Sequence, residues 1–424
     1  MKYITKRIKI HFLLAITAMM FILSSCNKSL EQFPAPAVVA PAGLALGETI
    51  ATIADDSLYY RMILRGGMLP AINNKSNQFT MFVPNNAAIR QFVTAASGGL
   101  IPAGSPDSNY VKFIDSTFIF PPGAKVGISR AQAAGIVNYN IIPQSITTAS
   151  IPNTFPNFFY PTNLNPTGTP ATVGYNPLVR LLTFPSTRNG NWVNNIPLVA
   201  VNATAANGII HTSAAVAVPP QRVLAQRIFV DADMTYLAAA ILRADSGVAP
   251  TTSASLQWVM SNFGPNITVF APTNLAFQQL LTGQITLALI AQGVPPATAA
   301  AQAAALASTP GVFTNPLLAN VLTPTTVKGI VVYHLLGNRA FTNNFPTTAT
   351  SYPTLLNSAI PTHPGVSLTC TFTGPFVSAA TVKGAANPTA SNILINPTPE
   401  PNGTSDQFFV NGTIHKIDQV LRPQ

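Results

Sequence analysis

Four short blocks of this sequence occur twice in the same order, and this duplication limits the folds that the chain can adopt. The separation between the two copies grows along the chain, from 178 to 188, 194 and 204 residues. Such growth is typical of a duplicated domain with loop insertions. The paired blocks are DDSLYYRMIL and DMTYLAAAIL, FTMFVPNNAAI and ITVFAPTNLAF, GIVNYNII and GIVVYHLL, and NGIIH and NGTIH. We therefore predict two related domains, 46–220 and 221–424, that meet near VPPQR.

The block ITVFAPTNLAF predicts a strand that leads directly into a helix. Residues 267–271 alternate as a strand does, and Pro272 ends the strand because it has no amide donor and biases the residue before it toward extended geometry. Thr273 or Asn274 then caps the helix, with Gly283 as the predicted stop. The block contains no nucleophile, base or metal ligand, which favours a folding joint over a catalytic loop.

The block NGTIH predicts a hairpin at the end of each copy, because Asn and Gly both accept the positive φ of a tight turn. His211 and His415 follow this turn at equivalent positions, and we expect structural hydrogen bonding from both. His334 and His363 show no ligand spacing. The sequence therefore predicts no metal ion and no cofactor.

The N-terminus predicts a lipoprotein leader. Basic residues precede an apolar run, 12–23, that is too short to span a bilayer, and LSSC follows at once and looks like a bacterial lipobox. This pattern makes 1–25 a signal peptide and Cys26 the lipidated first mature residue; the alternative is a short buried helix with an unrelated cysteine. Residues 26–45 would be a lipid anchor and a Pro/Ala-rich tether. No aspartate follows Cys26, so we expect an outer-membrane protein, at the cell surface or on the periplasmic face.

Composition excludes several classes of function. Only 8% of the residues are charged, against about 25% in ordinary soluble domains, so the predicted surface is mostly neutral and polar. No Lys/Arg cluster with interleaved aromatic residues indicates a nucleic-acid partner. The 12 acidic residues are scattered and suggest no carboxylate pair, so we predict no catalytic residues. Cys370, with alternating neighbours, is predicted to be a buried strand thiol.

Three motifs in order resemble those of fasciclin-like domains: TVFAPTNLAF, the pair Tyr333-His334, and NGTIHKIDQVLRP. The resemblance covers 221–424, and a more divergent copy covers 46–220, where Asn140 replaces the histidine. It implies an α+β fold of two modules, each a β-sandwich-like wedge with packed helices. It also implies an extracellular role in adhesion or matrix contact rather than catalysis.

The resemblance suggests one binding candidate, since the Tyr-His region is implicated in receptor contact in some animal relatives. Transfer of that role would apply only to Tyr333 and His334. The alternative is packing in the core, because IVVYHLL is apolar on both sides. The acidic-apolar adhesion motifs of the animal members are not evident after it.

The loop 155–177 offers a second binding candidate, because its exposed Phe158, Phe159, Tyr160 and Tyr175 would stack on sugar rings or pack against a partner protein. The alternative is that these rings cover the domain's own sheet. A second long polar loop is expected over Thr342–Gly365. An alanine-rich helix is expected over Val294–Ser308.

Two functions fit these features. The first is a non-enzymatic lipid-anchored cell-surface protein that mediates adhesion or protein/matrix binding. The second is an accessory glycan-binding lipoprotein of an outer-membrane polysaccharide-capture system. The expected partners are the membrane, through the lipid, and a protein or polysaccharide ligand.

Overall fold

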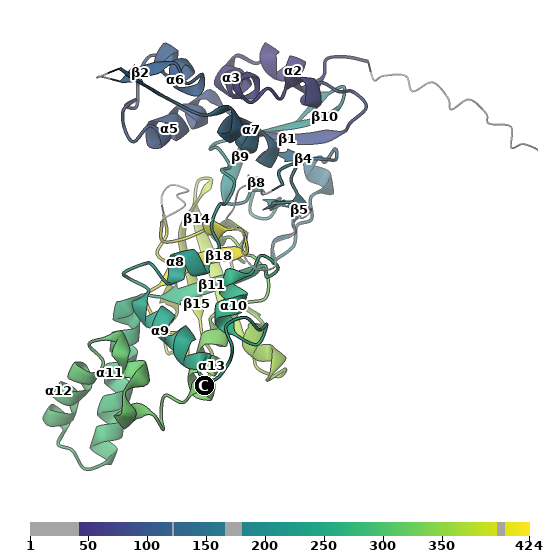
Figure 1. Cartoon of the computed structure of the whole chain (residues 1–424). Coiled ribbons are helices and arrows are strands. Elements are labelled where there is room, and N and C mark those ends of the chain that lie inside the picture. Colours follow the sequence, from purple (N-terminus) through teal and green to yellow (C-terminus); the bar gives the residue numbers. More distant parts are fainter. Residues whose placement is uncertain (1–41, 121–122, 166–179, 397–402) are drawn as a thin grey trace, which may run out of the picture. The chain divides into compact units, whose positions relative to one another are not determined.

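The computed structural model describes residues 42–120, 123–165, 180–396 and 403–424 (Figure 1). Ala42–Gln424 form one compact unit. Cys26, the signal peptide, most of the predicted tether and Tyr175 lie outside the described residues. Within the described ranges, no helix combines the length and the apolar character needed to cross a membrane.

The first module is built on a six-stranded sheet in the order β4-β1-β10-β9-β8-β7, with helices that precede and follow β1 (Figure 1). Its helices are α2 (Leu46–Thr52), η1 (Ala54–Asp56), α3 (Ser57–Gly66), α4 (Leu69–Ile72), α5 (Asn86–Ala96), α6 (Asp107–Ile114), α7 (Arg130–Tyr139) and η2 (Thr148–Ser150). Its strands are β1 (Phe79–Pro84), β2 (Phe118–Phe120), β3 (Ala124–Val126), β4 (Ile141–Ile142), β5 (Tyr160–Pro161), β6 (Leu182–Thr183), β7 (Pro185–Ser186), β8 (Trp192–Val193), β9 (Ile196–Ala205) and β10 (Gly208–Ser213).

The second module is built on two four-stranded sheets, in the orders β12-β11-β18-β17 and β13-β14-β15-β16. Its helices are α8 (Ala225–Ile228), α9 (Thr235–Ala244), α10 (Leu256–Ser261), α11 (Asn274–Ala291), α12 (Pro296–Leu306), η3 (Pro310–Thr314), η4 (Pro316–Leu318), α13 (Pro324–Tyr333), η5 (Thr342–Asn344) and η6 (Leu355–Ser358). Its strands are β11 (Ile267–Pro272), β12 (Leu335–Leu336), β13 (Thr350–Tyr352), β14 (Val366–Thr373), β15 (Phe376–Lys383), β16 (Ser391–Asn392), β17 (Gln407–Phe409) and β18 (Gly412–Ile417). The predicted alanine-rich helix is α12.

The two modules repeat each other in strand direction and register. β1 runs parallel to β10 with Phe79 opposite Gly208, and β11 runs parallel to β18 with Ile267 opposite Gly412. In both modules a short antiparallel strand, β4 or β12, pairs with the other edge of the central strand. The duplication predicted from the sequence blocks is therefore present in the fold, while the boundary near VPPQR stays a prediction.

The strand-to-helix joint is confirmed in both copies. The Thr273 hydroxyl accepts a hydrogen bond from the amide of Ala276 at 3.3 Å, and the Asn85 side chain accepts one from Ala88 at 2.9 Å. Each side chain thus satisfies an amide that the first helical turn leaves without a partner.

The predicted helix stop at Gly283 is wrong. α11 continues through Gly283 to Ala291, because Ile285 extends the buried stripe of this helix. The residues after Gly283 are mostly good helix formers, and they outweigh the cost of one glycine, about 1 kcal/mol.

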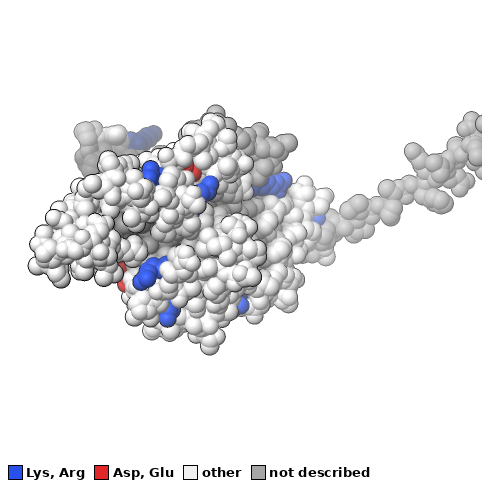
Figure 2. Space-filling view, turned by 90° about the horizontal axis from the view of Figure 1, so that it is seen from below, with Lys and Arg blue, Asp and Glu red and all other residues white. Residues whose placement is uncertain are grey.

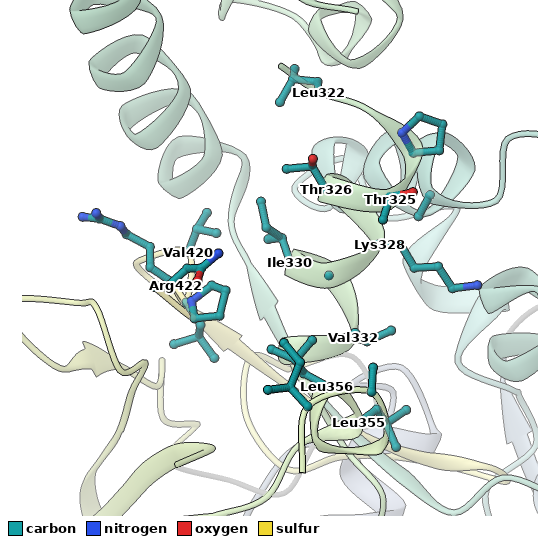
Figure 3. A pocket seen from close by; sticks show the side chains of 18 of the residues that line it. Leu322, Thr325, Thr326, Lys328, Ile330, Val332, Leu355, Leu356, Val420 and Arg422 are labelled. Carbon is teal, nitrogen blue, oxygen red and sulfur yellow. The ribbon is translucent and has the colours of Figure 1, made fainter. Parts of the chain in front are cut away.

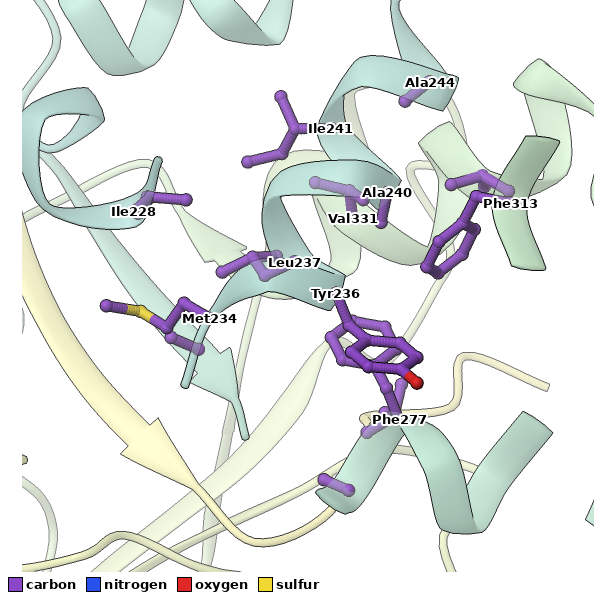
Figure 4. Packing of buried hydrophobic residues seen from close by; sticks show 14 of the residues in the cluster. Ile228, Met234, Tyr236, Leu237, Ala240, Ile241, Ala244, Phe277, Phe313 and Val331 are labelled. Atoms are coloured by element: carbon purple, nitrogen blue, oxygen red, sulfur yellow. The ribbon is translucent and has the colours of Figure 1, made fainter. Parts of the chain in front are cut away.

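Helices cover one face of the central sheet of the second module. Along α9, Leu237, Ala240 and Ile241 point into this core, and the Tyr236 ring stacks on Phe277 with centroids 6.1 Å apart (Figure 4). The buried Tyr236 hydroxyl donates to the carbonyl of Ala307 at 2.6 Å. The apolar stripe of α9 therefore faces the core, as its 3.6-residue period predicts.

The second sheet supplies residues to another core, and Cys370 of β14 lies in it. The Cys370 side chain is 1% exposed, and its thiol donates to the carbonyl of Phe345 at 3.3 Å. Burial raises the pKa of this thiol to about 12. The prediction of a buried strand thiol is confirmed, and so is the α+β fold with packed helices.

The hairpin at the end of each module is confirmed, but the reason predicted for Asn-Gly is wrong. Ala205 pairs with Gly208, and Phe409 pairs with Gly412, so each asparagine lies in the turn and each glycine already belongs to the strand. Neither asparagine has positive φ. A Cβ on Gly412 would lie 2.5 Å from the carbonyl oxygen of Ile267, so the glycine is needed for close approach of the parallel strand.

Each turn asparagine instead ties the hairpin to two helix ends. The Asn411 carbonyl oxygen accepts from the amide of Leu224 at 2.9 Å, and its amide donates to the carbonyl of Met260 at 2.9 Å. The equivalent Asn207 accepts from Leu46 at 2.9 Å and donates to Ile72 at 2.8 Å. These bonds satisfy backbone groups that helices leave without partners at their ends.

Candidate binding site

The segment that the sequence predicts as a long polar loop, Thr342–Gly365, is structured, and its first three residues are buried. The Asn343 amide donates to the carbonyl of Asn194 at 3.2 Å, and the Asn344 amide donates to the carbonyl of Thr154 at 3.0 Å. Both acceptors belong to the first module. Asn343 and Asn344 are polar and yet buried here because the neighbouring module supplies hydrogen-bond partners for both.

A buried arginine, Arg339, lies among aromatic rings from both modules. Its guanidinium carbon lies 4.8 Å from the ring centroid of Phe184 and 4.9 Å from that of Phe408. It also donates to the carbonyl of Val410 at 3.0 Å. Burial lowers the pKa of Arg339 to about 9, and the two ring faces offset part of this desolvation. Sequence reasoning missed Arg339 because its ring partners are distant in sequence.

Three of the predicted binding residues form one exposed aromatic patch, Phe158, Phe159 and Tyr160. The Phe158 and Phe159 side chains are 48% and 46% exposed, and their rings stack at 5.8 Å with an interplanar angle of 12°. The Tyr160 ring meets Phe158 edge to face at 5.2 Å. Both phenylalanine rings therefore leave about half of their surface open. The alternative, that these rings cover the domain's own sheet, does not explain this exposure.

The aromatic patch rests on the buried rings around Arg339. The Phe159 ring lies 6.4 Å from the buried Phe184, which the cation–π contact joins to Arg339. Just before the patch, Asn157 is buried and accepts from the amide of Phe341 at 3.3 Å. Just after it, Tyr160 pairs with Thr183 in the β5–β6 ladder. The backbone is held on both sides, so the rings are preorganised for contact with a ligand.

The aromatic patch presents two near-parallel phenylalanine rings and one hydroxyl. The paired phenylalanine rings offer π faces for the C–H faces of a sugar or for an apolar side chain. Burial raises the pKa of Tyr160, so its hydroxyl stays protonated and can both donate and accept a hydrogen bond. The patch suits recognition of a neutral ligand, not proton transfer.

The other predicted pair, Tyr333 and His334, is in the interior. The Tyr333 hydroxyl donates to the carbonyl of Gly365 at 2.6 Å and accepts from the amide of Ala385 at 2.8 Å. The His334 ring bonds the carbonyl of Ile330 through Nδ1 and accepts from Leu421 through Nε2, both at 2.8 Å. These contacts support the packing alternative, and the structure does not bring this pair together with the aromatic patch.

His211 and His415 are structural, as predicted. Both are buried, and each stacks on the phenylalanine opposite it in the parallel ladder, Phe82 or Phe270. The Nε2 atom of His415 bonds the carbonyl of Ala340 at 3.0 Å. Among the described residues, no group of three or more His, Cys, Asp or Glu is arranged to hold a metal ion.

The surface carries few charges. Figure 2 shows one face of the molecule, on which single basic and acidic residues lie scattered among uncharged ones. An uncharged surface leaves shape, aromatic contact and neutral hydrogen bonding as the main means of recognition, which is the chemistry of the aromatic patch.

Comparison with known proteins identifies the fold of the first module. Residues 56–219 match the Fasciclin domain family, and this segment lies in the copy whose motifs depart further from the family pattern. The second module repeats its strand directions and registers, so the fold is that of two fasciclin-like modules in tandem. Fasciclin domains are non-catalytic adhesion or binding modules.

No curated protein matches the chain. Among solved structures, it is similar to a FAS1 domain pair from the insect cell adhesion molecule fasciclin I. The identity is 13% and the TM-score 0.31, over 87% of this chain and 97% of that one.

Proposed function

We propose that this protein is a non-enzymatic, lipid-anchored cell-surface protein that binds another protein or a matrix polymer through its two fasciclin-like modules. The observation that carries the proposal is the aromatic patch. Exposed aromatic residues on a rigid support dominate the binding energy of many protein interfaces, because they bury a large area at little entropic cost. Here Phe159 packs against the buried Phe184, which contacts the buried Arg339, and Phe158 stacks on Phe159.

A second candidate function is glycan capture as an accessory lipoprotein of the outer membrane. The near-parallel stacking of Phe158 on Phe159 favours it, because two rings in this arrangement present the kind of surface on which sugar rings stack. Both functions use the same patch, so they differ in the ligand and not in the site.

The proposed location rests on the leader sequence. A basic start, an apolar run and LSSC precede the tether, in the order that a lipoprotein signal requires. Cys26→Ala is expected to leave the protein unprocessed and unlabelled by a fatty-acid probe, whereas Ser29→Ala in the tether is labelled normally. Persistent labelling of Cys26→Ala would contradict lipid attachment at this residue. Fractionation of the labelled wild-type protein between inner and outer membranes tests the outer-membrane location.

The binding proposal is tested on an array that carries both polysaccharides and matrix proteins. The test variant replaces Phe158, Phe159 and Tyr160 with Ala, and the matched control replaces Phe376. Phe376 is a phenylalanine of the second module that is 58% exposed and lies outside the patch. Circular dichroism of each variant verifies the fold.

Saturable binding to protein, lost in the triple variant and kept in Phe376→Ala, is the expected result. Saturable binding to a polysaccharide with the same dependence would replace the first function with glycan capture. Equal binding by all variants would remove the aromatic patch as the site of either function.

A further inference from the structure

A second surface feature lies apart from the aromatic patch, in the second module. It is a groove of about 1020 Å³ along α13, bounded by the end of α9, by α11, by η6 and by the last residues of the chain (Figure 3). Figure 3 shows Ile330 in the middle of the groove, Leu322 near the start of α13, and Leu355 and Leu356 beyond its end. An apolar cleft of this size with a few polar groups is typical of small-molecule sites.

The first module has the same groove, along α7. It is smaller, about 620 Å³. When the repeat offsets are applied, 13 of the 18 residues that line it fall on residues that line the groove of α13. The groove is therefore a feature of the duplicated fold and not an accident of one loop.

A repeated glycine lies in the middle of each groove helix, Gly135 in α7 and Gly329 in α13. A Cβ added at either position would meet no atom within 4 Å, so nothing in the described structure requires a glycine there. Glycine inside a helix is destabilising relative to alanine. A third helical glycine in open space, Gly283, has Ala95 at the equivalent position, so it is not repeated. The space above the helix backbone is therefore open to a ligand at both repeated glycines.

The two grooves differ in charge. Lys328 and Arg422 line the groove of α13, where the first module has Ala134 and Val218. Figure 3 shows the two basic side chains on opposite sides of Ile330, each with its charged end pointing away from Ile330. No Asp or Glu side chain is among the residues that line either groove.

Both basic groups of the second groove have donors left for a ligand. The Nε of Arg422 is buried and has no hydrogen-bond partner in the described part of the chain, so the donors that a ligand can reach are the terminal guanidinium nitrogens. The Lys328 ammonium donates to the carbonyl of Ala254 at 2.9 Å, which leaves two of its three donors. An arginine at the rim of an apolar groove matches a carboxylate on an apolar ligand.

We propose that the groove of α13 binds a long-chain carboxylate. The acyl chain lies along α13 over Gly329 and against Ile330, Leu355 and Leu356. The carboxylate accepts hydrogen bonds from Arg422, and Lys328 adds positive potential from the opposite rim. The groove of the first module has the apolar floor without the cations and does not select for a carboxylate. This site is independent of the function proposed for the aromatic patch.

The probe for this proposal is cis-parinaric acid, whose fluorescence rises in apolar surroundings, with its methyl ester as the uncharged comparison. The full chain is expected to bind the acid saturably. Arg422→Gln is expected to weaken binding of the acid by about tenfold, the loss typical of a hydrogen bond to a charged group, and to leave the ester unchanged. Equal loss for the acid and the ester, or no loss for either, would overturn the role of Arg422.

The glycines provide matched variants. Gly329→Leu fills the groove of the second module and is expected to abolish saturable binding of the acid, whereas Gly135→Leu is expected to preserve it. Gly329→Ala separates loss of binding from loss of folding, because it should raise the melting temperature while it weakens binding of the acid. Absence of saturable binding by the wild-type chain, or equal loss in Gly135→Leu and Gly329→Leu, would refute the site.

Discussion

Replacement of Asn411 tests the claim that the turn asparagine acts through its side chain. Asn411 is fully buried; it accepts from the amide of Leu224 and donates to the carbonyl of Met260, both at 2.9 Å. Asn411→Ala and Asn411→Gly each remove both bonds. A turn that needed only a backbone able to adopt positive φ would accept glycine without loss. The two explanations of the Asn-Gly motif therefore predict different results for Asn411→Gly.

The expected loss follows from the groups left without partners. A buried amide or carbonyl that loses its partner costs about 1–3 kcal/mol, so two of them lower the free energy of unfolding by about 2–6 kcal/mol. Glycine adds roughly 0.5–1 kcal/mol because it loses more conformational freedom on folding. Asn411→Gly is therefore expected to be at least as destabilising as Asn411→Ala.

The assay is urea unfolding followed by tryptophan fluorescence, since the chain has two tryptophans. Trp258 lies in α10, the helix whose end Asn411 holds, and Trp192 lies in β8 of the first module. Trp192→Phe leaves Trp258 as the reporter of the second module, so loss of two-state behaviour does not obscure the result. Asn207→Gly is the matched variant of the first module and is read with Trp192 alone.

A free energy of unfolding of Asn411→Gly within about 0.5 kcal/mol of the parent value, the range of an ordinary surface substitution, would refute a role for the Asn411 side chain. Such a result would show that the Asn-Gly motif acts through its turn geometry alone. A loss in Asn411→Ala that Asn411→Gly does not share would support the same conclusion.

Three further predictions concern buried titratable groups. Burial, with Asp55 nearby, raises the pKa of Asp56 to about 6. This carboxyl therefore stabilises the native state below its unfolded pKa of 3.8 and loses that contribution as pH rises through 6. Asp56→Asn should raise the melting temperature at pH 8 and have little effect near pH 4. Burial lowers the pKa of His334 from 6.5 to about 4, so the contribution of the neutral ring to stability is lost as pH falls through this window. His334→Asn, which copies Asn140 of the first module, should flatten the dependence of the melting temperature on pH in this window. An unchanged dependence would contradict the lowered pKa. The Cys370 thiol, with its pKa near 12, should resist iodoacetamide at pH 8 until urea unfolds the chain, and rapid alkylation of the native protein would show that it is accessible.

Local features of the fold are predictable from the sequence because their causes lie within a few residues. The joint at Thr273 is one example, since the cap and the amide that it accepts from are three residues apart. The exposed Phe158 and Phe159 are another, because they lie in a polar insertion between the repeated blocks. Even here the stop at Gly283 was wrong, because helix formers on both sides decide whether one glycine ends a helix.

The distant partners of several buried polar residues were not predictable from the sequence. Asn411 acts through Leu224 and Met260, which are 187 and 151 residues away. Asn343 and Asn344 are buried because the first module supplies some of their partners. A polar side chain gains from burial only when a partner is in place, and a linear sequence does not show that partner.

The sequence by itself determined the duplication, the strand-to-helix joints and the resemblance to fasciclin-like modules, because periodicity, capping and repeated blocks depend on neighbouring residues or on direct comparison of segments. Only the tertiary structure decided that Tyr333 and His334 lie in the core, that Arg339 supports the aromatic patch, and that repeated glycines open equivalent grooves. The physical reason is that burial, cation–π contact and cavity formation require residues far apart in the chain to meet, and their energies exist only after the chain has folded.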